Sequence, residues 1–342
     1  MKVLSLFSGA GGIDIGFKNA GFKTIIATDN WNIACETLKK NKISEEVICG
    51  DIRNIDFKRL KKKINFDCVV GGPPCPPYSK SRFYLKNKKR ALEDENSFTL
   101  ISYFDAIKII KPKCFFFENV NGFVFKPHLA AFHYLKEQSE KLGYNISYKV
   151  INSANYGVPQ IRQRFICIGF QKKYGHFEFP KETHCNPDLQ EDLFLKPWIN
   201  CKEVIGDLDF TSKNDNLTIP GAKHSHLLKL IPPGENYLFF TKERGHKKPL
   251  FKWRSRYWSF LLKLSPKKPS WTIQASFSNN MGPFHWKNRF LKISEIKRIQ
   301  TFPDDHQLEG TFNDQWKLVG NAVPPLLAKI IAKSIKKQIT KI

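Results

Sequence analysis

The feature that most constrains the fold of this chain is a regular alternation of short apolar runs and helical stretches over its first 170 residues. The runs typical of strands are Val3–Phe7, Thr24–Thr28, Glu46–Cys49, Asp67–Val70, Cys114–Glu118, Ile146–Ile151 and Phe165–Gly169. The stretches with helical spacing are Ile13–Asn19, Ile33–Asn41, Phe98–Ile110 and Leu129–Lys141. This alternation predicts an α/β fold with a mainly parallel sheet, in which ligands bind at the carboxyl ends of the strands.

The second half of the chain differs from the first in composition and in hydrophobic periodicity. Residues 176–288 are rich in Pro, His, Asn and Trp and lack helical periodicity, which predicts an irregular, loop-rich region. Helical spacing returns at Ser294–Gln300, with Ser294 as a candidate N-cap, and at Leu326–Lys337. No apolar stretch has the length of a membrane span, and the N-terminus lacks a signal-peptide pattern, so we expect a soluble cytoplasmic protein without membrane contact.

The charge balance is strongly basic. The 342 residues include 56 Lys and Arg against 31 Asp and Glu, a formal net charge of +25. Such an excess favours a polyanionic partner, either nucleic acid or an acidic membrane surface. A solvated basic surface without a specific partner explains the charge equally well.

The eight cysteines show no CxxC spacing, and several lie inside apolar runs. We therefore expect small, buried, reduced side chains and no disulfides. A group of His and Cys residues in the second half has a spacing that fits no common zinc site, so we predict no metal; its members are His184, Cys185, Cys201, His224 and His226.

Three consecutive strand ends carry features that suit a nucleoside. Leu4–Gly12 ends a strand and opens a helix with glycines that permit a tight turn, although both the P-loop and GxGxxG spacings are missing. Asp29 follows the second strand and can accept hydrogen bonds from ribose hydroxyls. Asp51 follows the third and can accept one from an adenine amino group. Each acid is also compatible with a simple helix N-cap.

The segment Val69–Ser79 is the most specific in the chain. Four prolines and two glycines surround Cys75, which holds a thiol at a strand end as a nucleophile requires. A structural Cys in a Pro-rich turn is the alternative. Glu118 ends an apolar strand, where burial raises a carboxyl pKa and allows proton donation at neutral pH. The basic, aromatic-containing run Lys80–Arg90 suits a lid over a phosphate backbone, or else is a solvated loop.

Taken together, these segments resemble the C5-cytosine DNA methyltransferase family almost from end to end. The matching segments follow the family's order: Phe7–Gly12, Asp29, Asp51–Ile52, Gly72–Cys75, Glu118–Val120, Tyr156–Pro159 with Gln160–Arg164, Arg289–Pro303 and Gly320–Pro325. Two departures stand out. Pro76-Pro77-Tyr78-Ser79 replaces the usual Gln-x-Phe-Ser, and Asp29 replaces the more frequent Glu.

The resemblance implies a Rossmann-like methyltransferase domain that uses S-adenosyl-L-methionine and releases S-adenosyl-L-homocysteine. It also implies a smaller target-recognition domain at residues 176–313, between catalytic segments 1–175 and 314–342. The implied catalytic residues are Cys75, Glu118, Arg162 and Arg164. The implied cofactor residues are Phe7, Ser8, Gly9, Gly11, Gly12, Asp29, Asp51, Ile52, Gly72, Pro74, Asn321 and Val323. The implied DNA-binding residues are Ser79, Lys80, Arg82, Gln160, Arg254 and Arg256.

In the mechanism that the resemblance implies, the Cys75 thiolate adds to carbon 6 of a flipped-out cytosine. Protonated Glu118 bonds nitrogen 3, Arg164 holds the base carbonyl and Arg162 braces Glu118. The implied partner is double-stranded DNA, with a cognate restriction endonuclease and a monomeric state by family analogy. The alternatives are a tRNA cytosine methyltransferase on the same scaffold and a DNA-binding protein with a degenerate catalytic site. A small-molecule methyltransferase would need neither the basic lid nor the second region.

Overall fold

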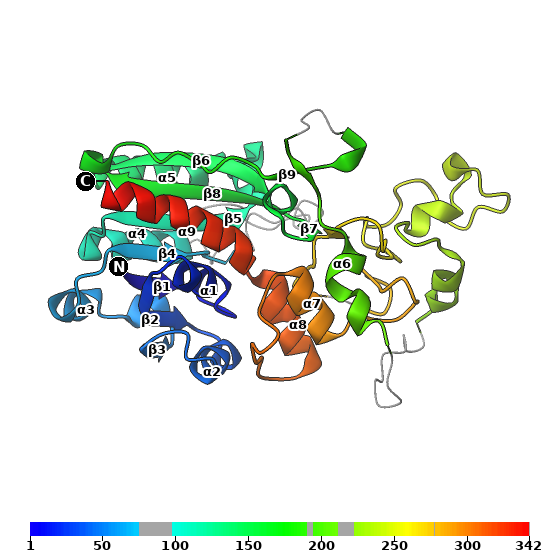
Figure 1. Ribbon diagram of the computed structural model, residues 1–342, viewed down its shortest axis with the longest axis horizontal. Coiled ribbons are helices and arrows are strands. Elements are labelled where there is room, and N and C mark those ends of the chain that lie inside the picture. Colours follow the sequence, from blue (N-terminus) through cyan, green and yellow to red (C-terminus); the bar gives the residue numbers. More distant parts are fainter. Residues whose placement is uncertain (75–97, 190–193, 211–221, 277, 342) are drawn as a thin grey trace.

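The computed structural model describes residues 1–74, 98–189, 194–210, 222–276 and 278–341. In this part of the chain the central element is a seven-stranded sheet with strand order β3-β2-β1-β4-β5-β8-β6 (Figure 1). Its strands are β1 Lys2–Leu6, β2 Lys23–Asp29, β3 Glu46–Cys49, β4 Cys68–Gly71, β5 Cys114–Val120, β6 Tyr144–Asn152 and β8 Gln163–Gln171. The five strands from β3 to β5 run parallel, and β8 runs antiparallel to both β5 and β6. The predicted α/β fold with a mainly parallel sheet is confirmed.

Helices cover both faces of the sheet. The described helices are α1 Gly12–Asn19, α2 Asn32–Lys40, α3 Phe57–Lys63, α4 Phe98–Ile110, α5 Leu129–Lys141, α6 Cys201–Ile205, α7 Ile293–Ile299, α8 Phe312–Asn321 and α9 Pro325–Thr340. One core cluster packs α4 and α5 on the sheet through residues such as Tyr103 and Leu135. A second packs α1 and α9 on the opposite face through Phe17 and Ile331. The C-terminal helix is therefore part of the core of the N-terminal half.

The point where the strand order reverses lies at β1, which is hydrogen-bonded to β2 on one side and to β4 on the other. Crevices at such points bind ligands in open α/β sheets. The C-terminal segment packs against this crevice. A Cβ at Gly12 would lie 2.3 Å from the Val323 carbonyl oxygen, and one at Gly16 would lie 2.4 Å from the Ala328 Cβ. Only glycine permits this approach of α1 to the segment that opens α9.

The sequence-predicted elements agree with the structure apart from shifts at their ends, but three helices were missed: α3, α6 and α8. The expected N-cap at Ser294 is wrong, because α7 begins at Ile293 and is capped at Lys292. Glu295 supplies the acceptor that closes this turn, since its Oε2 accepts the Lys292 backbone N–H at 2.7 Å.

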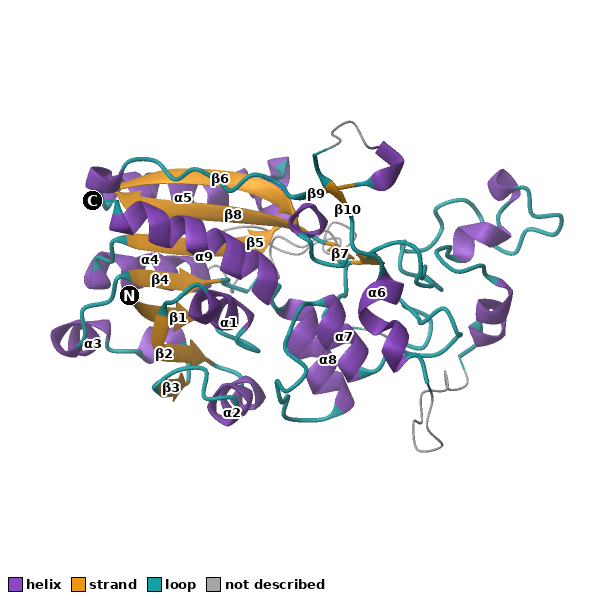
Figure 2. Cartoon of the chain, in the orientation of Figure 1, coloured by secondary structure: helices purple, strands orange, loops and turns teal. Residues whose placement is uncertain are grey.

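The second half of the chain forms a loop-rich lobe beside the sheet domain (Figure 2). It contains the short strands β9 His184–Cys185, β10 Lys196–Pro197 and β11 Ser270–Trp271, together with several single turns of 3₁₀ helix. The lobe has its own core cluster, which includes Tyr237 and Phe260. Strand β7, Gln160–Ile161, pairs with β11 and joins the lobe to the sheet domain.

A third core cluster mixes residues from both sides of the predicted domain boundary. It packs Ile15 and Leu38 of the N-terminal segment against Ile205 and Ile296 of the second region and against Trp316 of α8. The lobe is therefore built onto the sheet domain by a shared apolar core, and the boundary at residues 176 and 313 stays a prediction.

The expectation that all cysteines are reduced is wrong for one pair. Cys35 of α2 and Cys49 at the end of β3 form a disulfide. The pair was missed because the two cysteines lie 14 positions apart in the sequence, and only the packing of α2 beside β3 brings them together. Among the other described cysteines, the free ones are Cys68, Cys114, Cys167, Cys185 and Cys201.

The stretch Phe312–Thr340 is long and apolar enough, by length and composition alone, to cross a membrane, which the sequence reading did not register. It comprises α8 and α9 with a break before Pro325. Its most apolar window is 61% buried inside the chain. This stretch is therefore part of the apolar core.

Candidate active site

The loop after β1 has the backbone of a ligand cradle. Phe7, Gly9 and Gly11 have φ values of 55°, 54° and 79°, so the chain turns sharply between β1 and α1. The Ser8 N–H donates to the Thr28 carbonyl at 2.9 Å, which fixes the loop to β2. A Cβ at Gly9 would meet no atom within 4 Å, so the space beside this residue is open.

Asp29 is held by the same loop. Its Oδ2 accepts the Gly9 N–H at 2.8 Å, and its Oδ1 accepts the Trp31 N–H at 2.9 Å. Burial raises the pKa of this carboxyl, while the backbone N–H groups and the charge of Lys317 oppose the rise. Asp29 is not the N-cap of α2, since Trp31 takes that position. An oriented, half-buried carboxylate at a strand end suits the recognition of ribose hydroxyls.

Asp51 fits the alternative role of an N-cap more closely than the role of an adenine ligand. It is the N-cap of the 3₁₀ turn Ile52–Asn54 and accepts the Arg53 backbone N–H at 2.9 Å. The Arg53 guanidinium also binds its carboxylate, which lowers the Asp51 pKa. The same guanidinium lies 4.2 Å from the centroid of the Phe98 ring. Ile52, the second residue predicted for adenine, is buried.

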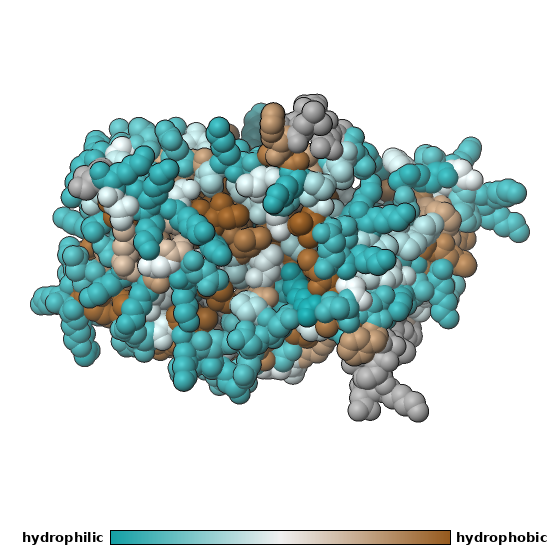
Figure 3. Space-filling view, viewed as in Figure 1, coloured by the Kyte–Doolittle hydropathy of each residue, from teal (hydrophilic) through white to brown (hydrophobic). Residues whose placement is uncertain are grey.

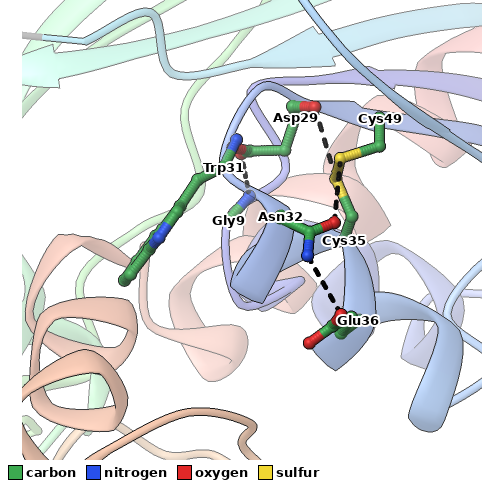
Figure 4. The surroundings of a disulfide bond; sticks show 7 residues. All are labelled: Gly9, Asp29, Trp31, Asn32, Cys35, Glu36 and Cys49. Carbon is green, nitrogen blue, oxygen red and sulfur yellow. Dashed lines mark hydrogen bonds between the residues drawn. A yellow bond between two sulfur atoms is a disulfide. The ribbon is translucent and has the colours of Figure 1, made fainter.

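The disulfide lies beside Asp29 (Figure 4). Cys35 Sγ is 3.3 Å from the Asp29 carbonyl oxygen, and Cys49 is separated from Asp51 only by Gly50. The bridge therefore joins α2, whose Cys35 contacts the Asp29 carbonyl, to the end of β3 that precedes Asp51. The sequence reasoning gave these cysteines no part in the site.

Trp31 is a further residue that the sequence reasoning missed. Its half-buried indole lies two residues after Asp29, with the Lys317 ammonium 4.3 Å from the ring centroid. An aromatic side chain next to an acid at a strand end is a signal of nucleoside binding, because the acid suits ribose hydroxyls and the ring suits a purine face. The open space at Gly9, the half-buried carboxylate and the indole together fit an adenosine-containing cofactor.

A buried ion pair forms the second half of the site. The Arg164 Nε lies 2.9 Å from the Glu118 Oε1, and both side chains are largely buried. The pair follows from the sheet register, because Glu118 of β5 faces Ile166 of the antiparallel β8 and Arg164 is two residues away on the same side. Burial raises the Glu118 pKa, and the charges of Arg164 and Arg162 oppose that rise.

The chain that leads to the predicted nucleophile passes close to this pair. A Cβ at Gly72 would lie 2.8 Å from the Glu118 Oε2, so a larger residue there would displace the Glu118 carboxylate. The Asn119 side chain donates to the Pro73 carbonyl at 3.2 Å and holds the two strand ends together. Pro74 is the last described residue before the gap. The predicted site residues Cys75, Ser79, Lys80 and Arg82 lie outside the described residues.

Arg162 and Gln160 are fully buried at the junction with the C-terminal segment. The Arg162 guanidinium donates to the carbonyls of Ile273 at 3.1 Å and Gly320 at 2.8 Å, and Gln160 is hydrogen-bonded to Gln300. Arg164 therefore makes the ion pair with Glu118, whereas the sequence analysis expected Arg162 to brace Glu118 and Arg164 to hold the base carbonyl. Arg162 acts on Glu118 through its charge while its hydrogen bonds join the lobe to α8.

The remaining predicted residues lie in two places. Val323 is buried behind Gly12, whereas Asn321 is exposed at the end of α8. Arg254 and Arg256 are exposed in the lobe, far along the chain from the strand ends. Hydrophilic side chains cover most of the molecular face in Figure 3, in keeping with the net charge of +25.

Comparison with known proteins finds a family that the chain matches over nearly its whole length. The family model described as C-5 cytosine-specific DNA methylase matches residues 1–337. The type II methyltransferase M.SacI of Streptomyces achromogenes is 34% identical, over 99% of this chain and 93% of its own length. The type II methyltransferase M.FnuDI of Fusobacterium nucleatum is also 34% identical, over 99% of this chain and 95% of its own.

Solved structures show the same fold. A putative DNA modification methyltransferase encoded within an E. coli prophage superposes with a TM-score of 0.70 at 20% identity, covering 99% of each chain. A Spodoptera frugiperda DNMT2 variant gives a TM-score of 0.68 at 15% identity, again with 99% of each chain covered.

Proposed function

We propose a residue-level mechanism for this chain, which belongs to the C-5 cytosine-specific DNA methylase family. The chain is a DNA cytosine-5 methyltransferase, and the curated relatives that it resembles over nearly its whole length are type II methyltransferases. Three things remain to be assigned: the cofactor, the role of each residue and the partners.

The methyl donor in this proposal is S-adenosyl-L-methionine, which leaves as S-adenosyl-L-homocysteine. Asp29 accepts hydrogen bonds from its ribose, and the Trp31 indole lies against its adenine. Asp51 and Ile52 border the adenine edge, and the loop Phe7–Gly12 borders the methionine end. When bound, the cofactor supplies an electrophilic methyl group for carbon 5 of the cytosine. The Gly12 contact with Val323 supports this assignment, because it packs the C-terminal segment against the loop.

The chain's own residues activate the base. The Cys75 thiolate adds to carbon 6 of the flipped-out cytosine and forms a C–S bond. Glu118 in its protonated form donates to nitrogen 3 and draws electron density from the ring. Arg164 donates to the base carbonyl oxygen, and Arg162, which lies between β7 and β8, acts on Glu118 through its charge. Once carbon 5 carries the methyl group, loss of the carbon 5 proton expels the Cys75 sulfur as a thiolate, and the nitrogen 3 proton returns to Glu118, which restores the ring.

The observation that carries this proposal is the buried Glu118–Arg164 pair beside Gly72. Burial raises the pKa of the Glu118 carboxyl, which favours its protonated form, while the charges of Arg164 and Arg162 oppose the rise. The close approach of Gly72 to the Glu118 carboxylate supports a path of the nucleophile loop directly past the acid.

For the partners, we propose a specific double-stranded DNA sequence read by the region 176–313, with catalysis in 1–175 and 314–342. The residues assigned to DNA are Ser79, Lys80, Arg82, Gln160, Arg254 and Arg256, with Gln160 acting through its buried network. Gly72 and Pro74 border the cofactor from the catalytic side, and Asn321 from the C-terminal side. By analogy with the relatives, we propose a restriction–modification system with a cognate endonuclease, a monomer and a cytoplasmic location.

Two alternatives are less well supported. A tRNA substrate rests on the likeness to DNMT2, which at 15% identity shows the fold alone. A DNA-binding protein with a degenerate site is opposed by the intact Glu118–Arg164 pair.

Bisulfite sequencing of genomic DNA tests the function and its target together. Cells that express this chain should carry 5-methylcytosine at one short sequence, and cells that express the Cys75→Ser variant should carry none. An unmodified genome together with modified tRNA would favour the tRNA alternative. An unmodified genome and unmodified tRNA would overturn the proposal.

A further inference from the structure

One short loop of the lobe carries three exposed aromatic side chains close together in the sequence. In residues 252–258, Lys-Trp-Arg-Ser-Arg-Tyr-Trp, every residue is exposed. We call this segment the aromatic–arginine loop. It presents Trp253, Tyr257 and Trp258 to solvent together with three cationic side chains, among them Arg254 and Arg256. Aromatic rings interleaved with cations are typical of surfaces that bind nucleic acid bases and phosphates.

The loop is exposed but not loosely attached. The Tyr237 hydroxyl donates to the Arg256 carbonyl at 2.9 Å and accepts the Arg256 N–H at 3.1 Å. The Asn236 side chain donates to the Trp258 carbonyl at 2.8 Å. Asn236 and Tyr237 are both 1% exposed. Two buried polar side chains thus fix the backbone, and the aromatic side chains project from a rigid base.

Trp258 connects this loop to strands β11 and β7. Its ring contacts the Trp271 ring edge to face, with the centroids 5.3 Å apart. Trp271 belongs to β11, where it pairs in register with Ile161 of β7. Ile161 immediately precedes Arg162, and Arg164 follows two residues later. The indole pair therefore lies where the lobe meets the strand that leads to the catalytic arginines.

Both indoles remain open to solvent, with Trp258 48% and Trp271 38% exposed. Large apolar side chains that cluster on a rigid surface mark a contact site for a partner. Here the neighbouring cations favour a polyanion, and the chain is a DNA methyltransferase. A duplex from which one cytosine has been extruded offers unstacked base faces, which aromatic rings can cover.

We propose that the Trp258–Trp271 pair is a stacking wedge that covers the bases exposed beside the flipped target cytosine. Arg254 and Arg256 anchor the adjacent backbone phosphates, and Asn236 and Tyr237 position the loop. The wedge rests on the proposed function and deepens it, because it assigns the stabilisation of the flipped state to two named residues outside the catalytic set. The Trp258–Trp271 pair is expected to stabilise bound DNA only when the target cytosine has left the base stack.

The test compares two duplexes that carry the recognised sequence, one with a normal base pair at the target cytosine and one with an abasic site opposite it. The second duplex needs little energy for flipping. The single-turnover methylation rate is measured with saturating enzyme for Trp258→Ala and Trp271→Ala. Tyr148→Ala serves as the control, since Tyr148 is a comparably exposed aromatic residue on β6.

On the paired duplex, each Trp variant should be slower by roughly 5- to 150-fold, the value of one base–aromatic contact. On the abasic duplex, most of this loss should disappear, and Trp258→Phe should stay close to wild type on both. An equal loss on both duplexes would show that the indoles support the lobe fold, and no loss on either would also overturn the wedge. Wild-type protein that methylates neither duplex would contradict the proposed function itself.

Discussion

Arg164 is paired through its Nε with the Glu118 Oε1 at 2.9 Å, across two antiparallel strands at the centre of the site. Both groups are proposed to contact the same cytosine, Glu118 at nitrogen 3 and Arg164 at the carbonyl oxygen. In the structure described here they contact each other, so the base would take up hydrogen bonds that the pair now satisfies internally. The acid and the arginine are therefore expected to behave as one unit.

The first prediction concerns the acid. Glu118→Gln keeps the shape of the side chain but removes its proton, so the methylation rate should fall by about 10²- to 10⁴-fold. DNA affinity should change little, because no phosphate contact is lost. Rapid-quench methylation and a filter-binding titration measure the two quantities. A Glu118→Gln variant that retains wild-type turnover would remove Glu118 from the mechanism.

Asp29 gives the second prediction. Asp29→Asn should weaken S-adenosyl-L-methionine binding by about 10- to 100-fold, since hydrogen bonds to a charged acceptor are worth roughly 1.5–3 kcal/mol. Asp51→Asn should weaken binding less, because Arg53 already occupies that carboxylate. Calorimetry with the cofactor alone measures both. Equal losses in the two variants would contradict this ranking of the acids.

Much of this site could be predicted because its residues follow strand ends directly in the sequence. Asp29, Gly72 and Glu118 each close an apolar run, and parallel strands bring such positions to one edge of a sheet. Helix α3 was missed because its sequence, Phe-Lys-Arg-Leu-Lys-Lys-Lys, has too few apolar positions to show a helical period. The fold was thus readable where hydrophobic periodicity is strong.

The parts that could not be predicted depend on contacts between distant segments. The Arg162 bonds to the Ile273 and Gly320 carbonyls span 111 and 158 positions of the sequence. The Cys35–Cys49 bridge depends on how α2 packs beside β3. The spacing of residues along the sequence does not indicate either contact.

The third prediction is a dependence of stability on pH. Asp14 is buried in α1, where it accepts a hydrogen bond from Thr24 at 3.0 Å, and burial raises its pKa to about 6 from 3.8. The folded chain thus binds this proton more tightly than the unfolded chain, so the free energy of unfolding falls as pH rises through that interval. The Asn side chain of Asp14→Asn does not ionise, so this variant does not lose stability in this way as pH rises.

The unfolding free energy of Asp14→Asn minus that of wild type should therefore be larger at pH 8 than at pH 4, by up to about 3 kcal/mol. Urea unfolding at the two pH values measures the difference. A gap between variant and wild type that is the same at both pH values would show that Asp14 is not the titrating group.

The fourth prediction concerns the cysteines. Protein purified without reductant and then denatured should react with a thiol reagent at six positions, since two of the eight cysteines are bridged. Reduction should free eight thiols and lower the unfolding free energy by about 3 kcal/mol, as for a loop of this length. Cys49→Ser should lose this response to reductant. Eight reactive thiols in the unreduced protein would contradict the bridge.

The central claim is that Cys75 forms a covalent bond to the cytosine that is methylated, and a fluorine at carbon 5 tests it most directly. Fluorine cannot leave as a proton does, so release of the Cys75 sulfur should be blocked after methyl transfer. DNA with 5-fluorocytosine at the target should give, with S-adenosyl-L-methionine, a denaturant-stable adduct that peptide mass spectrometry maps to Cys75. Cys75→Ser should give none, because a hydroxyl is a far weaker nucleophile at neutral pH. An adduct at another cysteine, or undiminished methylation by Cys75→Ser, would contradict the account.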